Sequence, residues 1–205
     1  MFDVPLARFD WKVCTSTRLG IVDVDSRPPI GAYQAVGSDP FPYFAGCNVG
    51  LRRSALQAVG GFNSALPYVY EDTDVCRQLN DAGYLFEYVE QLQVSHYREV
   101  NAVRDGQHVI TDPYVLALGR IVFAAHSQRD SKGHEQVMQL ARQWESEWVS
   151  HSSAHLAAGR FSTHEHEQFV ARAAAGTTEG IARASLPRPF TTIGPPPTDV
   201  FRQYR

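Results

Sequence analysis

The sequence predicts an α/β protein in which a region of mixed strands and helices precedes an α-helical extension. Short apolar runs bounded by turn residues dominate up to residue 100, whereas longer runs with helical spacing follow Pro113. The chain has 205 residues, of which 43% are hydrophobic, so it can bury a sizeable core. We divide it into a first domain at 1–100, a helical extension at 101–185 and a proline-rich tail at 186–205.

The net charge and the spacing of the cysteines argue against several classes of protein. The formal net charge of −3 gives no basic face, so we expect no nucleic-acid partner. The three cysteines lack C-x-x-C spacing, which argues against a disulfide framework or a zinc knuckle. No apolar run reaches the length of a membrane span, and the first residues lack the order of a signal peptide. We predict a cytoplasmic protein without a transmembrane segment, with peripheral attachment to the inner membrane as an alternative.

Residues 1–45 have the composition of a linker. Proline, glycine, serine and aspartate are frequent in this segment. One short strand is predicted at 20–24, and Pro28 and Pro29 then provide turn chemistry.

A strand and a short helix are predicted next. The segment NVGLRR at 48–53 is typical of a strand. The helix follows at 54–59, with Ser54 as its N-cap and Gly60 or Gly61 as its C-terminal stop.

An acidic segment, YVYEDTDVCRQLNDAG at 68–83, places three carboxylates within four positions, at Glu71, Asp72 and Asp74. Apolar residues recur on one helical face after them, and Gly83 can end that helix. The apolar face consists of Val75, Cys76, Leu79 and Ala82. We therefore expect the acids at the N-terminus of a helix.

This acidic cluster has more than one explanation. Acids in the first turn complement the helix dipole, each by about 0.3–1 kcal/mol, but a single carboxylate suffices as a cap. Three carboxylates repel one another, which keeps one of them basic enough to take a proton from an attacking alcohol. The cluster could equally attract a cation or bind sugar hydroxyls. The motif by itself leaves acid/base, metal and carbohydrate chemistry open.

Two further strands and three helices are predicted after the acidic helix. The strands are YLFEYV at 84–89 and LQVSH at 92–96. Asp112 and Pro113 form a helix start, a cap followed by proline at the first helical position. The predicted helices run over 115–126, 134–159 and 163–184. The prolines of the tail favour an extended or disordered end.

The stretch from about residue 43 to residue 100 contains, in this order, a G-C-N strand, an R-R-x-A-L helix, a G-G-F turn, an E-D-x-D helix, an A-G-Y turn and a strand ending in histidine. In these motifs and their order it resembles the acceptor half of a family 2 glycosyltransferase of the GT-A fold. The resemblance implies a partial GT-A core at 1–100, with a linker at 1–45 and acceptor-side motifs at 46–100.

The resemblance also implies roles for the acids. The aspartate of the E-D pair is the general base of inverting members and corresponds to Asp72, with Glu71 beside it to orient the acceptor. Asp74 is expected to cap the helix or bind substrate. Arg77 is expected to pair with the acids along the helix or to reach a phosphate.

Further substrate and metal residues follow from the same match. Gly46 and Asn48 correspond to the strand that borders the sugar site, where glycine permits close approach and the amide can bind hydroxyls. His96 corresponds to a histidine that completes a divalent metal site in several GT-A families, so Mn²⁺ or Mg²⁺ is the implied cofactor. The letters DVD at 23–25 match a D-x-D metal motif, but they lie in the expected linker.

The implied function is inverting transfer of a sugar from a nucleotide-sugar donor to the hydroxyl of a glycan or other carbohydrate acceptor. Because only 45 residues precede Gly46, we expect the donor half to be missing, as in a truncated or split enzyme. We then expect no UDP affinity tighter than about 1 mM from the chain alone. An exposed sheet edge would favour self-association, which sedimentation can test. The alternative is a non-catalytic remnant that binds carbohydrate or protein.

Overall fold

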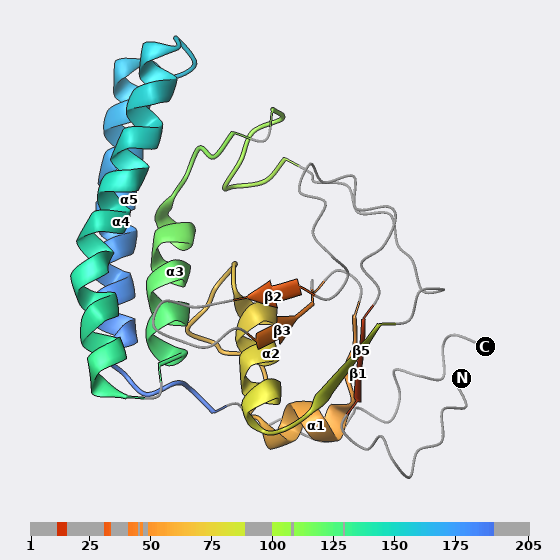
Figure 1. The fold of residues 1–205 in the computed structure, drawn as a ribbon. Coiled ribbons are helices and arrows are strands. Elements are labelled where there is room, and N and C mark those ends of the chain that lie inside the picture. The colour runs from red at the N-terminus through yellow and green to blue at the C-terminus, as the bar shows by residue number, and fades with distance from the viewer. Residues whose placement is uncertain are drawn as a thin grey trace, which may run out of the picture.

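A group of long helices stands beside a smaller region of strands and short helices (Figure 1). The structure is a computed structural model. It describes residues 12–15, 31–33, 41–44, 46, 49–88, 100–107, 109–128 and 130–190. The strands predicted at 20–24 and 92–96 fall outside these residues.

The described strands are few and short. Three of them form a sheet in the order β4-β1-β5, namely β1 (Lys12–Thr15), β4 (Val49–Gly50) and β5 (Leu85–Tyr88). Strand β1 pairs in parallel with β5 and antiparallel with β4. A separate antiparallel pair joins β2 (Gly31–Tyr33) to β3 (Phe41–Tyr43). Within the described ranges the chain is mostly helical, so they do not display the full α/β sheet of a GT-A core.

The helices occur where the sequence predicts them. They are α1 (Arg53–Ala58), α2 (Glu71–Asp81), α3 (Tyr114–His126), α4 (Ser131–Ala157) and α5 (Thr163–Ala184). Gly60 and Gly61 after α1, and Gly83 after α2, have φ values of 78°, 71° and 81°, which confirms them as helix stops.

Two helix starts differ in detail from the prediction. The N-cap of α1 is Arg52, whose extended backbone continues from β4, so Ser54 lies inside the helix and does not cap it. Pro113 occupies the N-cap position of α3 and not the first helical position that was predicted for it. Asp112 still caps this helix, because its Oδ1 accepts a hydrogen bond from the backbone N–H of Tyr114 at 2.9 Å.

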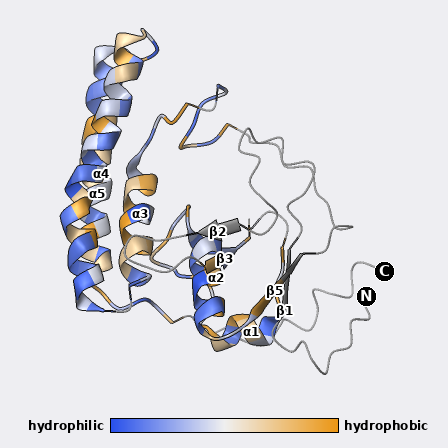
Figure 2. Ribbon diagram, viewed as in Figure 1, coloured by the Kyte–Doolittle hydropathy of each residue, from blue (hydrophilic) through white to orange (hydrophobic). Residues whose placement is uncertain are grey.

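Helix α3 joins the two hydrophobic cores. One face, with Leu118, Val122 and Phe123, packs with α2 and β3 around Phe41 and Phe44. Another face of α3 packs with α4 and α5; its residues there are Ile121, Ala124 and Ala125. Figure 2 accordingly shows α3 mostly in the hydrophobic colours. None of the helices among the described residues is long and apolar enough to cross a membrane.

The predicted apolar face of α2 is confirmed in its main part. Val75, Cys76 and Leu79 are fully buried, whereas Ala82 follows the last helical residue and is exposed. The Sγ of Cys76 accepts a hydrogen bond from the backbone N–H of Phe44 at 3.3 Å. This face fixes α2 against β3.

Candidate functional site

The three acids lie in the first turn of α2, as predicted. The N-cap residue, Tyr70, has φ 70° and ψ 2°, a left-handed conformation that is uncommon for a bulky residue. Its ring stacks on Phe123 of α3, with 5.0 Å between centroids and 3° between planes. This stacking stabilises the turn from which Glu71 and Asp72 project.

Asp72 is held by three hydrogen bonds. Its Oδ2 accepts from the backbone N–H of Gly46 at 2.8 Å, while Oδ1 accepts from the N–H and the hydroxyl of Thr73 at 2.6 and 3.1 Å. A Cβ on Gly46 would lie 3.3 Å from the Cβ of Asp72, so the approach requires a small residue. The structure thus brings together two predicted site residues that are 26 positions apart.

Glu71 has a different environment from its neighbour. Its Oε2 is buried and has no hydrogen-bond partner among the described residues. Burial raises the pKa of the Glu71 carboxyl, the charge of Asp72 raises it further, and the backbone N–H of Glu71 partly opposes these effects. Glu71 therefore holds a proton more tightly than an ordinary glutamate. We refer to Gly46, Glu71 and Asp72 as the acidic site.

Asp74 faces the interior. It is 0% exposed, and its carboxylate pairs with Arg188, whose Nη2 and Nε lie 2.7 and 3.0 Å from Oδ2. The same guanidinium donates to the carbonyl of Gly61 at 2.9 Å. In this structure Asp74 joins α2 to the segment after α5, and its expected role in substrate binding stays a prediction.

The structure changes the expected partner of Arg77. This side chain is 2% exposed and forms its ion pair with Asp81, one turn later, at 3.0 Å. The pairing with Asp74, three positions earlier, was wrong because Arg188 occupies that carboxylate. The guanidinium of Arg77 also lies over the ring of Phe41, 5.3 Å from its centroid. A contact between Arg77 and a phosphate stays untested.

Asn48, His96 and the DVD letters at 23–25 lie outside the described residues, so their predicted roles are not placed. Within the described ranges, no group of three or more His, Cys, Asp or Glu side chains could hold a metal ion.

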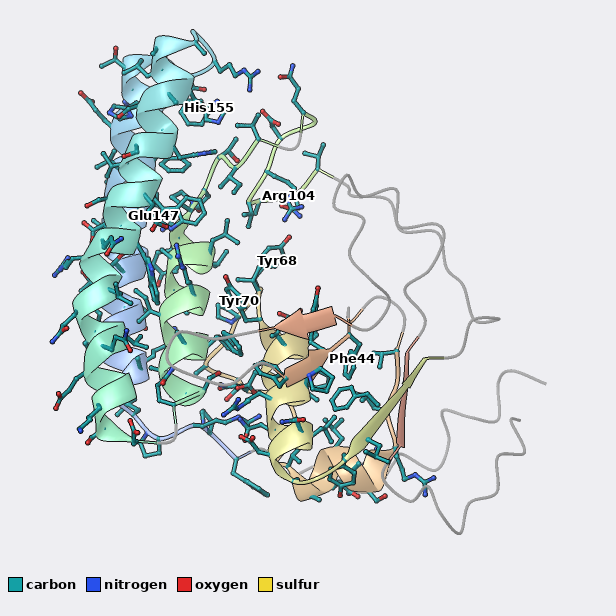
Figure 3. The ribbon with its side chains drawn as sticks, viewed as in Figure 1. Phe44, Tyr68, Tyr70, Arg104, Glu147 and His155 are labelled. Atoms are coloured by element: carbon teal, nitrogen blue, oxygen red, sulfur yellow. The ribbon has the colours of Figure 1, made fainter. Side chains whose placement is uncertain are left out.

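Polar residues that the sequence analysis did not single out meet at the loop that precedes α2. Tyr68 precedes α2, and its hydroxyl accepts a hydrogen bond from Asn101 Nδ2 at 3.0 Å. Figure 3 shows Tyr68 between the N-terminal end of α2 and the turn that carries Arg104. The Nε of Arg104 is buried without a hydrogen-bond partner in the described part of the chain. No sequence motif identifies these residues, because the contact depends on residues 100–107 lying against the loop before α2.

Comparison with known proteins gives one match. The sequence model of Glycosyl transferase family group 2 matches residues 29–146, which is more than half of the chain. The match begins just before β2, includes the acidic site and α3, and ends within α4, so it extends beyond the stretch 43–100 on both sides. Searches of curated proteins and of solved structures gave no match. The order of motifs around Gly46 and Asp72 and the family match agree, and the chain belongs to glycosyl transferase family group 2.

Proposed function

We propose that the chain provides the acceptor side of an inverting glycosyltransferase, with Asp72 as the general base. The observation that supports this most directly is the carboxylate of Asp72, held against the backbone N–H of Gly46 at 2.8 Å inside the matched segment. The donor is a nucleotide sugar, and the acceptor is a hydroxyl of a carbohydrate or glycan.

The hydrogen bonds of Asp72 suit this role. A carboxylate has about four acceptor positions, and Gly46 and Thr73 occupy three of them on Asp72. One position remains for the acceptor hydroxyl, and the side chain is partly exposed. The fixed carboxylate orients this hydroxyl without further loss of side-chain entropy.

The proposed step is a single displacement. The acceptor oxygen forms a bond to the anomeric carbon, the bond from that carbon to the diphosphate breaks, and the nucleoside diphosphate leaves with the electron pair. The hydroxyl proton passes to Asp72. Glu71, with its raised pKa, provides a hydrogen-bonding carboxyl beside the same acceptor.

A divalent cation such as Mn²⁺ or Mg²⁺ would neutralise the diphosphate in such a reaction. Asp74 does not fit this cation because it is paired with Arg188, and three of the roughly four acceptor positions of Asp72 are already occupied. His96 remains the proposed ligand, together with groups outside the described residues.

The proposal is tested by joining the chain to the donor half of an active family member and measuring nucleoside diphosphate release. In Asp72→Asn we expect a fall in turnover of about 10²–10⁴-fold with acceptor affinity little changed. The matched control is Asp130→Asn, because Asp130 caps α4 by accepting from Gly133 N–H and asparagine caps equally well.

Two outcomes would contradict the proposal. An Asp72→Asn enzyme with most of its turnover would make Asp72 a cap only. An inactive wild-type fusion would favour a non-catalytic binding module. The new amide must face a donor N–H of either Gly46 or Thr73, so thermal unfolding is measured in parallel to exclude a folding defect.

A further inference from the structure

We propose that His151 and His155 of α4 form a chelating site for a divalent transition metal of the Cu²⁺, Ni²⁺ and Zn²⁺ class. The two residues are one turn apart, and their Nε2 atoms lie 3.2 Å from each other. Two nitrogens bound at about 2.0–2.1 Å to a tetrahedral zinc ion are about 3.3–3.4 Å apart. The pair therefore already has the spacing that one shared cation requires.

The orientation of the rings supports a shared ligand. Their centroids are 4.5 Å apart, and their planes meet at 76°. If the two rings lay end to end across an N–H···N bond, each centroid would lie one ring radius beyond its nitrogen. The distance between the centroids would then be larger than the one observed. The two Nε2 atoms thus point toward the same side. Binding requires each neutral ring to carry its proton on Nδ1, which leaves both Nε2 lone pairs free.

Aromatic side chains brace both imidazoles. The ring of His155 lies 5.1 Å from that of Phe161, and the ring of His151 lies 6.0 Å from Phe169 and 6.1 Å from Trp148. These contacts restrict the motion of both imidazole rings, and both histidines stay partly exposed. A braced pair loses less rotamer entropy when it binds a cation.

The donor atoms determine which metal the site takes. Glu147, one turn before His151, is ion-paired with Arg120. With Glu147 paired in this way, the described residues offer the two imidazole nitrogens as ligands, and water completes the coordination shell. Imidazole nitrogens favour Cu²⁺, Ni²⁺ and Zn²⁺ over Mg²⁺ and Mn²⁺. The site is separate from the acidic site, and both histidines lie beyond the matched residues 29–146.

The experiment measures metal binding to the full chain by calorimetry with ZnCl₂, NiCl₂ and MgCl₂, and by electron paramagnetic resonance with CuCl₂. We expect saturable binding of Zn²⁺ and Ni²⁺, none of Mg²⁺, and hyperfine coupling of Cu²⁺ to two nitrogens. His155→Gln and His151→Gln should each weaken binding by roughly 10²-fold, because the second ligand of a chelate acts intramolecularly.

The control is His164→Gln, since His164 lies on α5 and its Nε2 pairs with Gln168 at 3.0 Å. This variant should bind zinc as the wild type does. Circular dichroism verifies that all variants fold. If the double variant His151→Gln/His155→Gln binds zinc and copper with wild-type affinity, or if the wild type binds neither, the pair is only a hydrogen bond and the proposal is overturned.

Discussion

Glu71 and Asp72 are neighbours in the chain, yet their surroundings differ. The oxygens of Asp72 accept three hydrogen bonds, whereas Oε2 of Glu71 is buried and has no partner among the described residues. An unsatisfied buried carboxylate destabilises the folded state, and this is the usual cost of an acid/base group at an active site. Glu71 is therefore the residue of α2 where the proposed function would conflict most with stability.

We predict that Glu71→Gln raises the melting temperature at pH 7 and leaves it unchanged near pH 4. The folded state raises the pKa of Glu71, so it favours the protonated form. That preference stabilises the wild type below the ordinary pKa of about 4.5 and is lost as the pH rises through the raised value. Glutamine is neutral throughout and avoids the loss.

Thermal unfolding followed by circular dichroism between pH 4 and pH 8 measures this effect. Glu167→Gln is the control, because Glu167 is exposed on α5. Equal pH profiles for Glu71→Gln and the wild type would show that the Glu71 carboxyl is not held in an unfavourable environment.

At the scale of elements, α5 lies close against α3 through two glycines. A Cβ on Gly176 would lie 2.3 Å from the carbonyl oxygen of Tyr114, and one on Gly180 would lie 3.1 Å from the Cα of Leu118. These are backbone atoms of α3, so they cannot move aside as a side chain can. The packing of the two helices therefore depends on the absence of side chains at both glycines.

We predict that Gly176→Ala destabilises the protein, by about 1–3 kcal/mol, although alanine favours helix formation. Urea unfolding measures the change. The matched control is Gly133→Ala in α4, where the new Cβ would meet the flexible side chain of Gln128, which can move at the cost of its hydrogen bond to the carbonyl of Ala124. That variant should lose less stability than Gly176→Ala. Equal effects of the two substitutions would mean that α3 and α5 can separate without cost.

At the scale of the whole molecule, the segment after α5 connects the long helices to α2. Arg188 pairs with Asp74 across 114 positions of the chain. Beside this pair, the Nε2 of His126 lies 3.0 Å from the carbonyl oxygen of Leu186. The Nδ1 of the same ring lies 3.1 Å from the side-chain nitrogen Nδ2 of Asn63. Burial lowers the pKa of His126, which favours the neutral ring that can donate at Nε2 and accept at Nδ1. The tail is expected to be extended or disordered; residues 187–190 form no helix or strand, but Arg188 fixes this segment to α2.

We predict that Arg188→Ala costs about 3–5 kcal/mol of unfolding free energy, because it leaves the buried carboxylate of Asp74 without its partner. Urea unfolding measures the loss. Arg160→Ala is the control, since Arg160 is exposed in the turn after α4. The double variant Asp74→Asn/Arg188→Met should recover part of the loss, because it removes both charges. A change below about 1 kcal/mol for Arg188→Ala would mean that this ion pair behaves like one at the surface.

The sequence by itself determined the local features of this protein. The spacing of apolar residues predicted α3, α4 and α5, and the acids and Gly83 predicted both ends of α2, because helix periodicity and capping depend on residues within a few positions of one another. The order of short motifs also predicted the family, which the match over 29–146 confirmed. Self-association through a sheet edge stays a prediction.

Only the tertiary structure decided which of the acids remain available for chemistry. Asp72 accepts a hydrogen bond from the backbone of Gly46, Asp74 is paired with Arg188, and Oε2 of Glu71 is buried without a partner among the described residues. The partners of Asp72 and Asp74 lie 26 and 114 positions away along the chain. No spacing rule links such segments, because burial and long-range pairing depend on how the helices pack and not on the order of residues within any one of them.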